Sequence, residues 1–345
     1  MRKLLPVFLL ASVLLSGCSS ETIKSQAEPT ESSEQGEISL DNLIPGLTEQ
    51  KAFDQTIAYL NSQRAIKAET VFLATENVSA PELQLEKELI GDAARMFQAY
   101  LDPENITVVM FTRGDGAWAD KKLEELGGDY PTRISTQISN VPSEYYCGFA
   151  FATRSDAGDP IYYTCTGSVG EREWPYRQTP PHEYFHLVQY QLTDESMPAW
   201  LIEGSAAFFG EVLGYKNLDT PILFRLQQNF NTSYGFDPDR EGFDWPRFQS
   251  WATDAEVDDV VNLYTKLEAS PTMDMERLAY YTLGSWATEA LIASFGFEKF
   301  MELWIEIERA GSFQEGFRIT FGLEPVDFYK KLTPLINSKV DPGLE

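Results

Sequence analysis

The pattern of hydrophobic residues predicts helices and a strand in the first part of the folded region. Segments 52–62 and 81–101 repeat apolar residues at helical spacing, most clearly at Leu85, Leu89 and Ala93, which lie among good helix formers. Segment 106–112, Ile-Thr-Val-Val-Met-Phe-Thr, is rich in β-branched and aromatic residues, which favour a strand.

Two further apolar runs predict a β-hairpin. They cover 147–153 and 161–165, and the turn-forming segment 155–160, Ser-Asp-Ala-Gly-Asp-Pro, separates them. A hairpin would bring Cys147, which opens the first run, close to Cys165, which closes the second. A disulfide in this loop would contribute roughly 3 kcal/mol, and two buried free thiols are the alternative. With the strand before it, the hairpin predicts a small, largely antiparallel sheet.

Beyond residue 180 the pattern becomes helical throughout. The predicted helices are 180–192, 198–213, 255–268, 274–295, 297–309 and 325–337, and the aromatic- and Gly-rich segment 229–251 is expected to be an irregular insert. The predicted fold class is therefore α+β, with residues 42–345 forming one domain. A mixed lobe of helices and a small sheet, 42–190, precedes an all-helical lobe, 191–345, and a cleft is expected at their junction.

The first 41 residues differ in kind from the rest. A basic start at Arg2 and Lys3 precedes a short apolar run, 4–15, which is typical of a signal peptide and too short to span a bilayer. Leu15-Ser-Gly-Cys18 resembles the lipobox of bacterial lipoproteins, which implies cleavage after residue 17 and lipidation of Cys18. An ordinary signal peptide with an incidental cysteine is the alternative. Residues 18–41, polar and poor in large apolar residues, predict a disordered tether, so the domain is expected in the cell envelope, anchored to a membrane.

Charge narrows the range of partners. The formal net charge of -26 argues against a nucleic-acid partner and against docking of the folded body on anionic lipid, because both need clusters of Lys and Arg. A well-solvated acidic surface is the simplest interpretation, and an acidic cleft for cationic substrates is the alternative. The acidic segment 237–242 resembles the start of a calcium-binding loop, but Phe248 stands where such a loop needs a bidentate Glu, so a surface loop is the better interpretation.

The two histidines of the chain fall in one motif. Segment 179–186, Thr-Pro-Pro-His-Glu-Tyr-Phe-His, contains His-Glu-x-x-His, and its Thr-Pro start predicts that a helix begins at residue 180. Residues four apart lie on one helix face, so His182 and His186 can grip a single tetrahedral Zn²⁺. Glu183 lies about 100° around the helix, beside the metal and within reach of a water bound to it.

A third protein ligand must then be a carboxylate. Glu203 lies in the otherwise apolar segment 198–207, far enough beyond His186 for a loop and a returning helix. Burying a carboxylate there without a metal or a partner would be costly. A Glu that faces solvent from an amphipathic helix is the alternative.

His-Glu-x-x-His followed by Trp-Leu-x-Glu-Gly-x-Ala resembles the gluzincin metallopeptidases, such as thermolysin-like and aminopeptidase N-like enzymes. The resemblance is strong over 180–211 and weaker over 274–330. It implies a zincin-like catalytic core with His182, His186 and Glu203 on zinc and Glu183 as general base. It also implies that Tyr281, in Tyr-Thr-Leu-Gly284, steadies the oxyanion. A Gly-x-Met-Glu-Asn-like segment, which binds the free N-terminus in aminopeptidases, is missing from the sequence.

The function predicted from these residues is zinc-dependent hydrolysis of peptide bonds in a peptide or protein substrate. Zinc would lower the pKa of its water and polarise the scissile carbonyl, and Glu183 would carry the proton to the leaving amine. An edge strand of the first lobe is expected to pair with the extended substrate. A zincin-fold lipoprotein that binds or assembles without turnover, and a zinc hydrolase of a non-peptide substrate, remain as alternatives.

Overall fold

The computed structural model describes residues 37–65, 70–128, 130, 132–140, 147, 150–167, 173–217, 254–269 and 277–339. The predicted signal peptide, Cys18, most of the predicted tether and the whole of segment 229–251 lie outside these residues. Within the described ranges, no helix is both long enough and apolar enough to cross a membrane.

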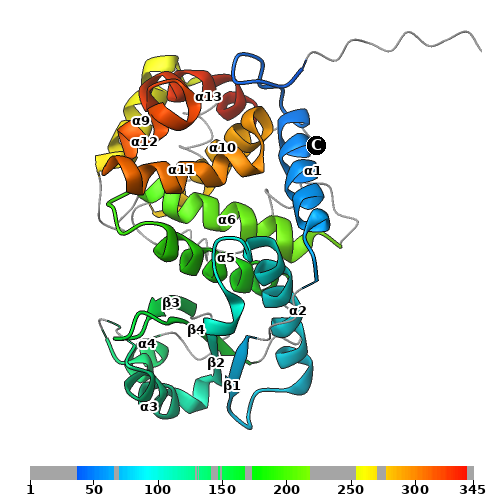
Figure 1. Ribbon diagram of the computed structural model, residues 1–345, viewed down its shortest axis with the longest axis vertical. Coiled ribbons are helices and arrows are strands. Elements are labelled where there is room, and N and C mark those ends of the chain that lie inside the picture. The colour runs from blue at the N-terminus through cyan, green and yellow to red at the C-terminus, as the bar shows by residue number, and fades with distance from the viewer. Residues whose placement is uncertain are drawn as a thin grey trace, which may run out of the picture. The chain divides into compact units, whose positions relative to one another are not determined.

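A four-stranded sheet forms one side of the domain (Figure 1). Its strands are β1 (Val71–Ala74), β2 (Thr107–Thr112), β3 (Ala150–Arg154) and β4 (Pro160–Thr166), and their order is β1-β2-β4-β3. β2 pairs in parallel with both β1 and β4, and only the β3–β4 hairpin is antiparallel. The sheet is therefore mixed, whereas the sequence predicted a largely antiparallel one. Crossover connections explain the difference. A helix between two strands brings the chain back to the end of the sheet where the first strand began, so the second strand runs parallel to the first.

The described residues of this region also form helices. They are α1 (Leu47–Ser62), α2 (Ala80–Phe97), α3 (Gly116–Leu126) and α4 (Ile134–Asn140), with short 3₁₀ turns at Pro103–Asn105 and Arg113–Asp115. α2 begins with a capping box in which Ser79 and Glu82 satisfy each other's backbone N–H groups. α1 and α2 confirm the two predicted helices, whereas β1, α3 and α4 were not predicted.

Two antiparallel helices, α5 (Glu173–Leu192) and α6 (Ala199–Tyr215), lie between the sheet and the helical region (Figure 1). α5 starts two turns earlier than predicted, so the prediction that it begins at residue 180 is wrong. Pro180 and Pro181 lie inside it, where proline has no N–H to donate to the preceding turn. Pro181 therefore donates no hydrogen bond to the carbonyl of Arg177. This carbonyl instead faces α6 at Gly214, where an added Cβ would lie only 2.5 Å from the carbonyl oxygen.

The rest of the described chain is helical. It forms α9 (Val257–Ala269), α10 (Arg277–Phe295), α11 (Phe297–Ala310), α12 (Phe313–Phe321) and α13 (Pro325–Lys339), which gather on the side of α6 away from the sheet (Figure 1). Their apolar faces and those of α1, α2, α5 and α6 share one large hydrophobic core. The structure thus confirms the α+β fold class, a mixed first region followed by an all-helical one.

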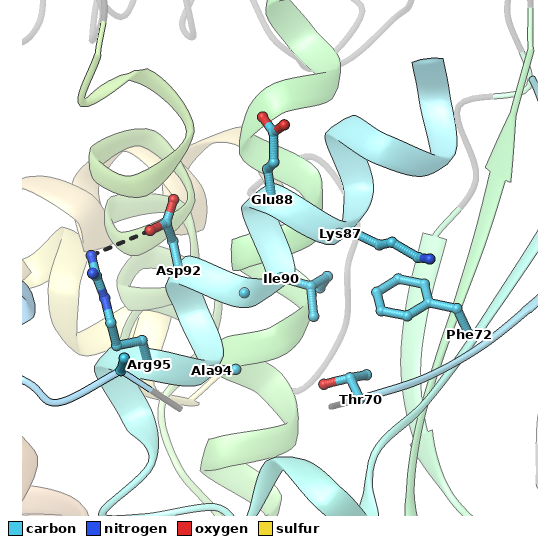
Figure 2. Close-up of a pocket in the computed structure, with 10 residues that line it drawn as sticks. Thr70, Phe72, Lys87, Glu88, Ile90, Asp92, Ala94 and Arg95 are labelled. Carbon is cyan, nitrogen blue, oxygen red and sulfur yellow. Dashed lines mark hydrogen bonds and ion pairs between the residues drawn. The ribbon is translucent and has the colours of Figure 1, made fainter. Parts of the chain in front are cut away.

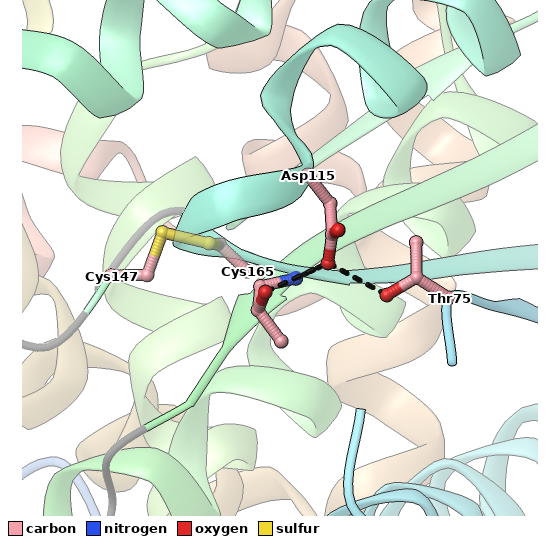
Figure 3. The surroundings of a disulfide bond; sticks show 5 residues. Thr75, Asp115, Cys147 and Cys165 are labelled. Atoms are coloured by element: carbon pink, nitrogen blue, oxygen red, sulfur yellow. Dashed lines mark hydrogen bonds between the residues drawn. A yellow bond between two sulfur atoms is a disulfide. The ribbon is translucent and has the colours of Figure 1, made fainter. Parts of the chain in front are cut away.

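A disulfide joins Cys147 to Cys165 inside a second, smaller core between the sheet and α3–α4, which confirms the predicted pairing (Figure 3). Both cysteines are buried. A buried disulfide is typical of proteins that fold outside the reducing cytoplasm. Beside it, the carboxylate of Asp115 accepts hydrogen bonds from Thr75 and Thr112, which ties the ends of β1 and β2 together.

Candidate metal centre

The three predicted ligands meet in one place, between α5 and α6. Nε2 of His182 lies 3.0 Å from Nε2 of His186, and Oε2 of Glu203 lies 3.5 Å from each of these nitrogens. Both histidines are buried, and the two rings are almost perpendicular. The described residues contain this cluster of His and acidic groups with ligand atoms close enough to share one ion.

The geometry and chemistry of the cluster fit a metal ion. Ligand atoms about 2.0–2.2 Å from a tetrahedral zinc ion are about 3.3–3.6 Å apart. The two separations of 3.5 Å from Oε2 of Glu203 fall in this range, and the 3.0 Å between the two Nε2 atoms is slightly shorter. Oε2 of Glu203 is buried and has no well-formed hydrogen bond, since its contacts with the imidazoles are long. A buried carboxylate oxygen without a hydrogen bond is costly, and a shared cation would remove that cost.

Backbone contacts between the two helices set this arrangement. His182 and His186 share a face of α5 because they are one turn apart. At Gly210 of α6 an added Cβ would lie 2.7 Å from the carbonyl oxygen of Gln178 and 3.1 Å from Cβ of His182, so α6 approaches α5 at a distance that only glycine permits. Trp200 fixes the start of α6, since it is fully buried and its indole N–H donates to the hydroxyl of Tyr329 at 3.2 Å.

Gln189, which the sequence analysis did not identify, orients one of the ligands. Its side-chain nitrogen donates to the carbonyl of Ile202 at 2.8 Å and to Oγ of Ser205 at 3.1 Å. Because a carbonyl can only accept, the oxygen of the Gln189 amide must point the other way, towards Nδ1 of His186 at 2.7 Å. Nδ1 therefore carries a proton, and in the neutral ring Nε2 keeps its lone pair for a metal. A glutamine one turn after the second histidine was the available signal in the sequence.

The electrostatics of the site favour a cation. Burial raises the pKa of Glu203, but the positive charge of His186 and the close approach of both imidazole rings outweigh it and hold the pKa well below its usual value. Burial lowers the pKa of His186, but Glu203 outweighs it and raises the pKa to about 9. A metal ion must displace that proton to reach Nε2, so metal affinity should rise with pH.

Glu183 lies beside the three ligands without belonging to the cluster. Burial raises its pKa, against the opposing influence of His186 and His182, and the charge of Glu203 raises it further. A hydrogen bond from the backbone N–H of Ala152 in β3 reaches its carboxylate. A buried carboxylate with a raised pKa has the properties of a general base or acid.

Tyr281 of α10 also faces the cluster. Its ring centroid is 5.7 Å from that of His182, with the two planes 26° apart. The neighbouring Tyr280 belongs to the large hydrophobic core instead. Of the two tyrosines, the one that the gluzincin resemblance pointed to is the one beside the candidate metal site.

A separate cavity of about 600 Å³ lies between α2 and the residues that lead into β1 (Figure 2). Lys87 extends over the ring of Phe72, and Asp92 pairs with Arg95 at 3.4 Å. Its lining contains none of the three candidate ligands.

A scan against protein-family models, a search of curated proteins and a search of solved structures found no match to this chain.

Proposed function

We propose that this protein is a zinc-dependent peptidase of the gluzincin type, held in the cell envelope by a lipid on Cys18. The triangle of ligand atoms from His182, His186 and Glu203 is the observation that carries the proposal. Two imidazoles and one carboxylate leave a fourth tetrahedral position open, which is the ligand set of catalytic rather than structural zinc.

Each residue around the ligands has a role in peptide hydrolysis. A bound zinc ion would supply Lewis-acid polarisation of the scissile carbonyl and a water of lowered pKa. The carboxylate of Glu183 takes the proton of the attacking water and delivers it to the leaving amine. The phenol of Tyr281 donates a hydrogen bond to the oxygen on which negative charge develops. Gln189 keeps the proton on Nδ1 of His186 and so holds the ring in its ligating tautomer.

The substrate would bind along β3. No described strand pairs with the side of β3 away from β4, and Ala152 on this strand already touches Glu183 through its N–H group. An extended peptide added to this edge would pass directly beside the general base, with its backbone held by strand-type hydrogen bonds. This placement favours a peptide over a substrate without an extended backbone.

The test combines metal analysis with digestion of a peptide library. The purified domain should hold one zinc per chain and cleave peptides, and His186→Ala should lose both properties. Glu183→Gln should retain zinc and lose cleavage, because it removes the base and leaves the ligands. A wild-type protein that binds zinc but cleaves no peptide would favour the non-catalytic or non-peptide alternatives. Full zinc occupancy in His186→Ala would overturn the site.

Membrane anchoring needs its own measurement. Cys18→Ser should release the protein from the membrane fraction, because residues 19–41 offer no other apolar anchor. Continued sedimentation of this variant with membranes would contradict a lipid on Cys18.

A further inference from the structure

Along the edge of β3 that no described strand covers, Arg154 places a cation near the candidate site. Ala150, Ala152 and Arg154 project from one face of the strand, because side chains alternate, and the two alanines pack against the large core shared with α5. Phe151 points the other way, into the core that contains the disulfide. The open edge ends just after Arg154, since Ser155 bridges to Gly128.

The guanidinium of Arg154 lies against the helix that carries the histidines. It sits 5.8 Å from the ring centroid of Tyr190, and Tyr190 follows His186 by one turn on the same face of α5. The rings of His186 and Tyr190 are 6.4 Å apart and nearly parallel. A continuous row therefore leads from the candidate metal ligands through Tyr190 to Arg154.

The contacts of the Arg154 guanidinium hold it in place and leave it able to bind another carboxylate. One nitrogen, Nη1, forms an ion pair with Asp194 at 3.2 Å, and the side chain of Asp194 is 87% exposed. An ion pair of this kind with a solvated partner contributes little, so a second carboxylate can join or replace it. The planar guanidinium is also held by a cation–π contact with the ring of Tyr190, which is 40% exposed.

We propose that Arg154 is a specificity-determining residue that binds a carboxylate of the substrate, an inference that rests on the peptidase function proposed above. A peptide paired with β3 places side chains on the same face as their cross-strand neighbours. Arg154 is two residues from Ala152, which contacts Glu183. The substrate residue opposite Arg154 is therefore two positions from the substrate residue that passes beside Glu183. The side chain of the residue opposite Arg154 lies next to the guanidinium. Arginine recognises carboxylates through paired N–H donors, so Asp or Glu is preferred there.

The experiment compares cleavage of matched peptides. Two peptides with amidated C-termini, one with Glu and one with Gln at the position that profiling identifies, measure the preference as a ratio of kcat/KM. We expect wild type to prefer Glu by about tenfold, since a charge-assisted contact has that strength. Arg154→Gln should bring the ratio near one, and Arg154→Glu should bring it below one, because two carboxylates repel each other. A third peptide, with Gln and a free C-terminus, tests whether a terminal carboxylate serves instead of a side chain.

Two controls separate specificity from structure. Arg318→Glu swaps the same charge on α12, where Arg318 pairs with Glu315, and should leave the ratio unchanged. Zinc content and melting temperature of the Arg154 variants report on folding independently of cleavage. A wild-type enzyme that cleaves peptides without preferring a carboxylate, or a preference that survives Arg154→Glu, would overturn this inference and leave the peptidase function standing. Failure of wild type to cleave any peptide would overturn both.

Discussion

Gly284 of α10 meets Gly204 of α6 at a point where neither helix can carry a side chain. A Cβ added to Gly284 would lie 2.7 Å from Cα of Gly204 and 2.0 Å from the carbonyl oxygen of Trp200. Gly204 directly follows Glu203, and Gly284 lies one turn after Tyr281. The close approach of the two backbones therefore brings Glu203, the third ligand, and Tyr281 to the same site. It also explains why glycine occupies both positions, since any side chain would keep the helices apart.

Gly284→Ala should destabilise the domain by about 2–3 kcal/mol or more, because the methyl group collides with backbone that cannot yield. Chemical denaturation measures the loss. The matched control is Gly91→Ala in α2, where an added Cβ meets nothing within 4 Å. That change should be neutral or stabilising by up to about 1 kcal/mol, because alanine favours the helix. Equal stability of the two variants would contradict the close contact between α6 and α10.

Gln189→Leu should weaken zinc binding by about 10–100-fold, because it removes the acceptor that fixes the tautomer of His186. Competition with a chromophoric chelator measures the affinity. Gln189→Glu keeps an acceptor towards Nδ1, so its affinity should stay closer to that of wild type. Gln84→Leu, an exposed glutamine on α2 that bonds only Glu88 among the hydrogen bonds described, is the surface control.

A spectroscopic readout distinguishes this role from simple packing. With two histidines in the chain, ¹⁵N spectra of the zinc-loaded protein can be assigned from His182 and His186 variants. Wild type should show a slowly exchanging Nδ1–H proton on His186, and Gln189→Leu should lose it. An unchanged proton signal together with unchanged zinc affinity would show that Gln189 does not orient His186.

Asp115→Asn should lower stability at neutral pH more than in acid. Burial alone would raise the pKa of Asp115, but hydrogen bonds from Thr112, Thr75 and Asn77 outweigh it and lower the pKa below its usual value. A depressed folded-state pKa means that the stabilisation is present above about pH 4 and is lost as pH falls through the folded-state value.

The loss should be about 1–2 kcal/mol at pH 7, a figure reduced because the carboxylate is partly exposed, and it should shrink towards pH 3. Urea unfolding at the two pH values measures it. Asp54→Asn, on the exposed face of α1, should change stability by less than about 0.5 kcal/mol at either pH. A deficit in Asp115→Asn that is the same at pH 7 and pH 3 would contradict the role given to the ionised carboxylate.

The parts of the structure that the sequence predicted are those that depend on local spacing. His182 and His186 share a helix face by geometry alone, and the cysteines of a hairpin are brought together by its turn. The parallel pairing of β1 with β2 depends instead on contacts between distant segments, and β1 has only four residues. Gln189 and Arg154 could not be identified because their roles depend on which way an amide points and on what lies across the strand. Pro180 lies inside α5, although proline is most common in the first turn of a helix, so its position does not mark where this helix begins.

Tyr281→Phe should lower kcat by about a hundredfold and leave zinc content and melting temperature nearly unchanged. The substitution removes one oxygen from a ring that lies beside His182, and a phenol aimed at a developing oxyanion typically contributes about 3 kcal/mol to the transition state. KM should change little, because the hydrogen bond strengthens only as charge develops.

Tyr280→Phe is the matched control, since the same atom is removed from the adjacent residue of the same helix. Tyr280 is 2% exposed and packs in the large core, about 100° around the helix from its neighbour, so its loss can affect stability but not turnover. A Tyr281→Phe enzyme as fast as wild type would remove the tyrosine from the mechanism. Loss of zinc in that variant would instead assign Tyr281 to the support of His182, because a residue that acts only on the transition state leaves the resting metal site intact.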